Sequence, residues 1–293
     1  MKRFGLILVD KPVGPTSHRV VSIVRRGTGV RKVGHAGTLD PRASGVLVLC
    51  LGSATRLSEF LSTATKRYEA LIRFGSSTQT YDSEGGIVRV TGAAPRLEDI
   101  QEVLPEFRGE IEQTPPPYSA IKIKGRKAYE LARQGEEVDL QPRPVTIYHL
   151  SLVSYRPPDL LLDIECSAGT YIRSLANDLG ERLATGAHLA SLRRTKAGPF
   201  TLEDCVSLNK LEMALASGDW EQYVRPAADA LPELPVVKVS GEKLKRVLNG
   251  NRIEAEEPAT GMARGIGPDG DLVAILEAVE QGEQWQPRKV FGR

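Results

Sequence analysis

The chain of 293 residues is long enough to bury a core of ordinary size, and its length suits one large domain followed by a small one. Hydrophobic residues at 41% and charged residues at 26% are typical of an ordinary globular protein, without internal repeats or low-complexity tracts. The net charge is +2, yet basic residues gather in segments 25–32, 121–133 and 192–196. A single such segment is usually a solvated face, but several together favour a nucleic-acid partner without establishing one.

The sequence indicates neither a membrane protein nor a zinc protein. The apolar run at the N-terminus stops at Asp10, too early for a signal peptide, and no stretch approaches membrane-spanning length. The three cysteines, Cys50, Cys166 and Cys205, form no C-x-x-C pair and do not cluster with the four histidines. We expect Cys50 and Cys166 to be small core residues of a protein in the reducing cytoplasm.

Apolar patterning predicts strands and helices over the first 110 or so residues. Ser17 follows a Pro- and Gly-containing turn, and we expect it to cap a helix over 18–26. In chain order the predicted elements are a buried strand at 4–10, this helix, a buried strand at 46–51, a helix at 54–62, a half-buried strand at 66–75 and a helix over 96–107 that holds up to Pro105.

The segment 114–145 differs in character from its surroundings. Prolines bracket a basic stretch with one weak amphipathic helix near 127–134, which predicts a projecting flap rather than core. The pattern then predicts a hairpin of strands at 146–155 and 160–167, a helix at 169–183, a strand within 187–200 and a helix at 207–217. A Pro- and Ala-rich stretch at 225–240 contains the expected boundary between a large domain at 1–228 and a small β-rich domain at 229–293.

Asp40, in the segment "GHAGTLDPRASG", is the first candidate for chemistry. Pro41 pushes Asp40 towards an extended conformation, and Gly34, Gly37 and Gly45 allow tight bends and a close ligand. Asp-Pro next to glycine is also a common surface turn, so the local pattern alone leaves both interpretations open. The buried strand that follows favours a rigidly mounted carboxylate, which is what catalysis needs.

Several other residues are candidates for the same site. His35 offers a flat polar ring that can stack on a base, and Arg173, at the start of a predicted amphipathic helix, can keep a buried carboxylate ionised. Tyr68 and Tyr171 are equally compatible with core packing, as Arg173 is with the surface. The sequence lacks the motifs of P-loop and dinucleotide-binding proteins, of α/β-hydrolases and of zinc metalloproteases.

The Asp40 segment resembles the catalytic motif of the pseudouridine synthases, and specifically the family of bacterial B-type tRNA pseudouridine-55 synthases. The similarity extends over roughly residues 4–205, and the C-terminal 60 or so residues resemble the PUA-type RNA-binding domain often appended to that family. The further segments that carry the resemblance are "LVDKPVGPTSHRVV", "ATKRYEALIRFGSSTQTYDSEG", "TPPPYSAIKIKGRKAYELARQG", "CSAGTYIRSLANDLG" and "LASLRRTKAGPF".

The resemblance implies the isomerisation of a T-loop uridine of tRNA to pseudouridine, without a cofactor, on an extruded base. It implies an α+β fold, with a mixed, largely antiparallel sheet, peripheral helices and a small C-terminal PUA-like β domain. The partner is tRNA, and we expect a monomer with no obligatory protein partner and no membrane contact. The site residues it implies are Asp40 as the essential carboxylate, Arg173 as its ion-pair partner, Tyr68 as the stacking residue, Tyr171 and Leu192 as pocket lining, His35 as a contact to displaced nucleotides and Lys11, with Pro12, as part of a turn beside the site.

Two alternatives remain. A guide-RNA-dependent synthase of the dyskerin type shares the core motif, but the long basic flap at 114–145 favours an enzyme that acts alone. A non-catalytic RNA-binding or RNA-folding module is harder to reconcile with Asp40, Tyr68 and Arg173 together, although assistance in tRNA folding is compatible with catalysis.

Overall fold

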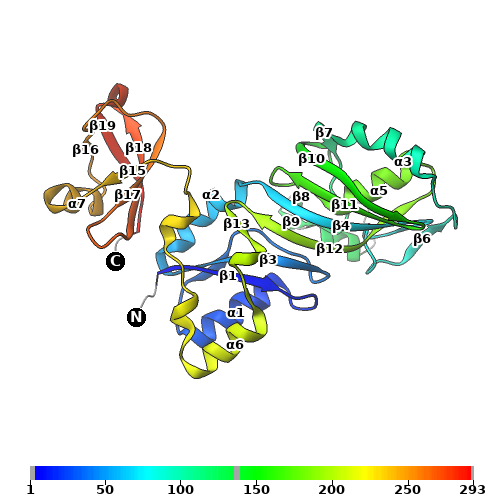
Figure 1. Cartoon of the computed structure of the whole chain (residues 1–293), viewed down its shortest axis with the longest axis horizontal. Coiled ribbons are helices and arrows are strands. Elements are labelled where there is room, and N and C mark those ends of the chain that lie inside the picture. The colour runs from blue at the N-terminus through cyan, green and yellow to red at the C-terminus, as the bar shows by residue number, and fades with distance from the viewer. Residues whose placement is uncertain (1–3, 120, 124, 135–138, 292–293) are drawn as a thin grey trace. The chain divides into compact units, whose positions relative to one another are not determined.

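The computed structural model describes residues 4–119, 121–123, 125–134 and 139–291. It divides into two compact units (Figure 1). The first contains residues up to 41, residues 45–62 and residues from 197 onward, and the second contains residues 42–44 and 63–196.

The first unit is built on a strand pair with a long apolar register. β1 (Gly5–Lys11) runs antiparallel to β3 (Ala43–Leu51) and parallel to β14 (Val206–Ser207), while β2 (Val33–His35) adds to β3. The helices α1 (Ser17–Thr28) and α6 (Leu208–Ser217) lie side by side next to β1 (Figure 1). The strands at 4–10 and 46–51 and both helices were predicted, and the structure confirms them.

Two details of this unit differ from the prediction. Thr16, not Ser17, is the N-cap of α1, and its side chain accepts a hydrogen bond from the Arg19 amide. Ser17 is the first helical residue, and its hydroxyl bonds to the backbone of Leu39 instead. The helix expected at 54–62 is divided into a 3₁₀ helix, η1 (Gly52–Leu57), and a single short α-helix, α2 (Ser58–Thr63).

The second unit contains five neighbouring strands of a larger sheet, in the order β12-β4-β11-β10-β7. The pairs β4–β11, β11–β10 and β10–β7 are antiparallel, and β10 and β11 form the predicted hairpin. The strands are β12 (Ala187–Ala197), β4 (Lys66–Phe74), β11 (Asp159–Cys166), β10 (Arg143–Arg156) and β7 (Gly109–Gln113).

One face of this sheet is covered by helices. Side chains of α3 (Leu97–Val103) and α5 (Ile172–Arg182) join those of β4, β10 and β11 in one apolar core. Cross-strand ion pairs lie between the strands as well, for example Arg73 with Asp159 at 2.7 Å. The predicted helix at 96–107 ends its α-helical part at Val103 and continues as the 3₁₀ helix η2 (Leu104–Phe107), consistent with Pro105.

The predicted flap lies between β7 and β10. Its described part contains the short strands β8 (Lys122–Ile123) and β9 (Arg126–Lys127), followed by α4 (Ala128–Arg133), which matches the expected weak helix. Residues 135–138 fall outside the described residues. The last three residues of the predicted segment, 143–145, belong to β10, because their backbone pairs with β7.

The C-terminal part of the first unit is a five-stranded sheet with the order β15-β17-β18-β19-β16. Its own core contains Val239, Val247, Leu276 and Trp285, with α7 (Gly241–Leu248) packed against β18 and β19. The strands are β15 (Val236–Lys238), β16 (Ile253–Glu254), β17 (Met262–Ile266), β18 (Leu272–Val279) and β19 (Gln284–Val290). The predicted α+β class, with a mixed and largely antiparallel sheet and a small C-terminal β-rich part, is confirmed.

Further short elements connect these. They are the hairpin of β5 (Ser76–Thr78) with β6 (Ile87–Val90), the strand β13 (Phe200–Thr201) and the 3₁₀ helices η3 (Leu202–Asp204), η4 (Trp220–Tyr223), η5 (Ala227–Ala230) and η6 (Glu280–Gly282). Within the described ranges, no helix combines the length and the apolar character that crossing a membrane requires.

Candidate functional site

Asp40 lies in the loop between β2 and β3 and is half-buried. Gly37 (φ 114°) and Gly45 (φ 104°) adopt backbone conformations that favour glycine, so they permit the bends on either side of it. Gly34 does not have a positive φ and lies within β2. The loop is therefore mounted between two paired strands; the strand after it was predicted, and β2 before it was not.

Both neighbours of Asp40 are held by specific hydrogen bonds. The Ser17 hydroxyl accepts a bond from the Leu39 amide (2.8 Å) and donates one to the Leu39 carbonyl (2.9 Å). On the other side, the Gly14 amide donates to the Pro41 carbonyl (2.8 Å). The backbone that carries Asp40 is thus fixed before and after the residue, which is unlike a mobile surface turn.

Lys11 organises the turn that supplies one of these bonds. Its side chain is fully buried, and its ammonium donates to the carbonyls of Pro12 (2.8 Å) and Pro15 (3.0 Å). Because Gly14 lies between these two prolines, Lys11 shapes the turn that contacts Pro41. His35 is the last residue of β2, is half-buried and lies opposite Leu49 of β3.

In the second unit, the predicted aromatic and apolar residues border one core. Tyr68 of β4 and Leu192 of β12 are partly buried and pack against the same apolar cluster. Tyr171 precedes α5, and both its backbone groups bond to the buried side chain of Gln113, at 2.8 Å and 3.0 Å. The next residue, Ile172, is a member of the cluster. The structure therefore brings Tyr68 and Leu192 to the edge of the same core, and Tyr171 lies next to a member of it in the chain.

Arg173 is buried in the first turn of α5 and makes several contacts in the second unit. Its guanidinium donates to the carbonyls of Thr80 (3.3 Å) and Tyr118 (3.2 and 3.3 Å). It also lies 3.6 Å from the carboxylate of Asp82, an ion pair in which both side chains are nearly buried. Arg173 thus joins α5 to the 80–82 loop and to the start of the flap.

Asp82 is a residue that the sequence reasoning missed. Its carboxylate also accepts bonds from the Glu84 amide (3.0 Å) and the Thr80 hydroxyl, so its position is strongly determined. The signal was present in the segment "TYDSEG", where an Asp followed by small and acidic residues is typical of a turn. The predicted pairing of Arg173 with Asp40 stays a prediction.

Burial changes the ionisation of several groups in the second unit. Burial and repulsion by Arg194 lower the pKa of Lys66, two residues before Tyr68, to about 8. Burial raises the pKa of Asp178, on α5, to about 6. Among the described residues, no group of three or more His, Cys, Asp or Glu side chains is arranged to hold a metal ion.

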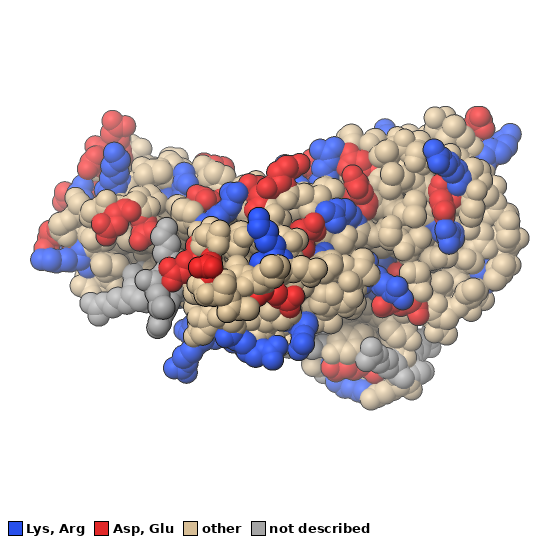
Figure 2. All heavy atoms as spheres, turned by 60° about the horizontal axis from the view of Figure 1, so that its bottom comes forward, with Lys and Arg blue, Asp and Glu red and all other residues tan. Residues whose placement is uncertain are grey.

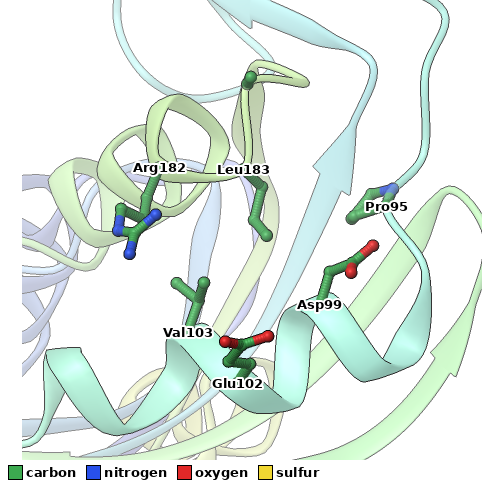
Figure 3. A pocket seen from close by; sticks show the side chains of 7 residues that line it. Pro95, Asp99, Glu102, Val103, Arg182 and Leu183 are labelled. Atoms are coloured by element: carbon green, nitrogen blue, oxygen red, sulfur yellow. The ribbon is translucent and has the colours of Figure 1, made fainter.

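Two surface hollows lie away from the seven predicted residues. One, of about 340 Å³, is lined by Pro95, residues of α3 and the end of α5. In Figure 3 Glu102 and Val103 project from α3, with Arg182 and Leu183 opposite them. The other, of about 310 Å³, includes Cys205, Lys210 and Arg225. None of the predicted site residues lines either hollow.

Three family models match consecutive parts of the chain. Residues 25–172 match the TruB family pseudouridylate synthase N-terminal domain. Residues 173–232 match the tRNA pseudouridylate synthase B C-terminal domain, and residues 234–292 match the C-terminal domain of tRNA pseudouridine synthase II.

Relatives and solved structures agree with these matches. The tRNA pseudouridine synthase B of Pseudomonas fluorescens is 43% identical over 98% of this chain and 95% of its own length. That of Geobacillus thermodenitrificans is 45% identical over 84% of each chain. A chain of an H/ACA RNP bound to a substrate RNA containing 2′-deoxyuridine superposes with a TM-score of 0.76, at 28% identity, over 99% of this chain and 86% of that one. A chain of a Cbf5-Nop10-Gar1 complex gives the same TM-score at 29% identity, covering 99% and 85%. The chain belongs to the TruB family of pseudouridylate synthases.

Proposed function

We propose that the protein converts the T-loop uridine at position 55 of tRNA to pseudouridine. The observation that carries this proposal is membership of the TruB family together with an Asp40 whose two neighbours are both clamped. The reaction breaks the bond between C1′ and N1 of the uracil and forms a bond between C1′ and C5. The C5 proton is lost to solvent and N1 gains one, so atoms and charge balance without a cofactor.

Asp40 is the catalytic carboxylate in this proposal. A uridine within a folded loop must be extruded before its C1′ can be reached, at a cost of a few kcal/mol. Stacking on an aromatic ring recovers roughly 1–3 kcal/mol per base, and Tyr68 is the residue proposed for it. Tyr68 is also proposed to assist the removal of the C5 proton.

Arg173 is proposed to keep Asp40 ionised and oriented, since a buried carboxylate without a cation would be protonated. Its ion pair with Asp82 supports a positioning role for both, because it holds the guanidinium in one pose. Tyr171 and Leu192 are proposed to line the uracil pocket, His35 to contact the displaced nucleotides and Lys11 to maintain the turn beside Asp40.

The flap is proposed to close over the T-loop, binding phosphates and excluding water. Support for this comes from its base. The Tyr118 carbonyl bonds to Arg173, and the Thr114 carbonyl accepts a bond from Ser174 (2.7 Å), so both ends of segment 114–118 contact α5. A movement of the flap would therefore displace carbonyl groups that bond to Arg173 and Ser174 at the start of α5.

Residues 229–293 are proposed to form an appended RNA-binding domain that contributes affinity. Phe291 and Ile275 share an apolar cluster with Leu6 of β1, so removal of this part would expose core surface. Substitution of an exposed lysine is the cleaner test. We expect K238Q to raise KM and leave kcat within about twofold, because an exposed lysine without an ion pair among the described residues can contribute a phosphate contact to binding and is remote from the chemical step. A fall in kcat with KM unchanged would contradict this role.

The decisive experiment is tritium release from an unmodified tRNA transcript carrying [5-³H]uridine, with the purified chain alone. We expect wild type to release one tritium per tRNA, and D40N to bind the tRNA without release. Binding without release by the wild type would instead indicate a guide-dependent enzyme or an RNA-folding module. Release by the purified chain would also support an enzyme that acts without a protein partner, and gel filtration tests the proposed monomer. We place this activity in the cytoplasm, where tRNA is modified.

A further inference from the structure

The helix α1 carries basic side chains along its outer side. It contains no acidic residue, and its interior side packs against α6 and β2 through buried valines. The exposed basic residues are Arg19, Arg25 and Arg26 of the helix, continued after its end by Arg31 and Lys32; we call these five residues the α1 basic face. Figure 2 shows Lys and Arg side chains gathered along the lower edge, on the side where Figure 1 draws α1 and α6.

The charge of this face is not neutralised by the protein itself. Among the described residues, the guanidinium groups of Arg25 and Arg26 bond only to Ser22 of their own helix, at 3.5 and 3.4 Å. Within the ranges that the structure describes, no carboxylate forms an ion pair with any of the five residues.

Several exposed arginines elsewhere in the chain are paired with carboxylates. Arg67, Arg73 and Arg96 contact Asp163, Asp159 and Asp99, and Arg182 contacts Glu106 at 2.7 Å. Such pairs leave little net charge for a partner. The α1 basic face differs in that five basic residues, unpaired within the described ranges, lie together on one helix and the turn after it, and a polyanion gains from such a cluster of positive charge.

The face is rigidly connected to the Asp40 loop. Ser17, the first residue of α1, bonds to both polar groups of Leu39, next to Asp40. At the other end, α1 is fixed by close packing, since a Cβ on Gly27 would lie 2.8 Å from the Cβ of Leu215 in α6. A ligand held on α1 is thus held at a constant position relative to Asp40.

We propose that the α1 basic face binds backbone phosphates of the RNA substrate outside the loop that supplies the reacting uridine. The proposal rests on the function proposed above for the Asp40 site. Arg19 and Arg26 are separated by about two helical turns, or about 10 Å, which suits contacts to neighbouring phosphates of one strand. Contacts of this kind position an RNA by its shape and carry no base specificity.

The face acts on binding rather than on the chemical step. We expect R25Q/R26Q to raise the Kd for a tRNA transcript roughly tenfold and to lower the slope of log Kd against log salt by about 2. The Kd is measured in a D40N background, where the substrate is not consumed. In the protein that retains Asp40, we expect the same substitutions to leave the single-turnover rate of tritium release at saturating protein unchanged.

The matched control is R96Q/R182Q, which removes the same charge from two exposed arginines that are paired with Asp99 and Glu106. We expect the control to leave the Kd and the salt slope unchanged. Circular dichroism and thermal melting verify that both double variants are folded, as expected from the exposure of all four side chains.

An unchanged Kd and salt slope for R25Q/R26Q would overturn the proposal while leaving the proposed reaction intact. Equal losses of tRNA affinity in the control and in R25Q/R26Q would also overturn it, since the loss would then follow from the change in net charge rather than from the position of the arginines. If R25Q/R26Q weakens tRNA binding as expected but the wild type releases no tritium, the result would support RNA binding by the α1 basic face and reject the proposed reaction. Loss of binding to phosphatidylserine vesicles, with RNA binding unchanged, would assign the face to membranes and reject the proposal.

Discussion

The Ser17 hydroxyl bonds to both the amide and the carbonyl of Leu39, at 2.8 and 2.9 Å, and so joins helix α1 to the residue before Asp40. Both groups are buried, so removing the hydroxyl leaves two backbone groups without this partner. We predict that S17A lowers the free energy of unfolding by about 1–3 kcal/mol. We also predict that it lowers kcat more than it changes KM, because the pose of Asp40 loosens. Denaturant titration and steady-state kinetics test both parts.

The control is S22A, which removes a serine hydroxyl from the same helix; in the described part of the chain this hydroxyl bonds only to Arg25. We expect S22A to change neither the free energy of unfolding nor kcat appreciably. A loss of stability in S17A without any loss of kcat would show that the clamp supports the fold but not the carboxylate.

The Arg173–Asp82 pair leads to a second prediction. In D82N the buried cation of Arg173 loses one charged partner, although the amide keeps the shape and part of the hydrogen bonding. We expect kcat to fall roughly 10- to 100-fold with a smaller effect on KM, since a positioning residue acts through Arg173 on the reacting state. Tritium-release kinetics measure this, and S83A, a change at the exposed neighbour, is the control. A D82N variant whose pH–rate profile and kcat match the wild type would remove Asp82 from the site.

Asp178 provides a prediction about pH. Burial raises its pKa from 3.8 to about 6, so the folded state binds this proton more tightly than the unfolded state does. Its contribution to stability is therefore complete below about pH 4 and is lost as the pH rises towards 7. We expect D178N to be more stable than the wild type by about 1–2 kcal/mol at pH 7 and equal to it at pH 4. Urea titrations at both pH values test this, and an equal gain at both would show that ionisation is not the cause.

Gly180 tests the close approach of α5 to β12. A Cβ at this position would lie 2.2 Å from the Ala187 nitrogen, and the Gly180 carbonyl already accepts bonds from Thr185 and Gly186. We expect G180A to cost at least about 3 kcal/mol of stability. G29A is the comparison, since Gly29 ends α1 at φ 67° with no atom near its missing Cβ, and should cost about 1 kcal/mol. Thermal melts of the two variants test this, and equal losses of stability in G180A and G29A would contradict the steric explanation.

The cysteines provide a chemical prediction. Burial raises the pKa of Cys50 to about 12 and that of Cys166 to about 11, so both stay protonated and shielded at pH 8. Cys205 is only half-buried. We expect Ellman's reagent to label Cys205 first in the native protein and all three thiols after denaturation. C205S should abolish the native reaction, and a persistent fast reaction in C205S would contradict the buried positions of the other two.

Local patterns determined most elements and some of the candidate site. Alternation and turn residues predicted the strands of the β10–β11 hairpin, because hydrophobic periodicity and Pro-containing turns act over a few residues. The same local rules were less accurate at helix ends. Thr16 and Ser17 are equally good caps by type, and only the competing bonds of Ser17 to Leu39 explain why Thr16 is the cap.

The sequence by itself determined the loop that carries Asp40 and, through its resemblance to a family over several short segments, the class of fold and the identity of the residues proposed to do chemistry. Only the tertiary structure decided which groups hold those residues. The clamp on Leu39, the ion pair of Asp82 with Arg173 and the bonds of Gln113 to Tyr171 all join residues far apart in the chain. Such contacts depend on how strands and helices pack, and a local pattern contains no information about that geometry.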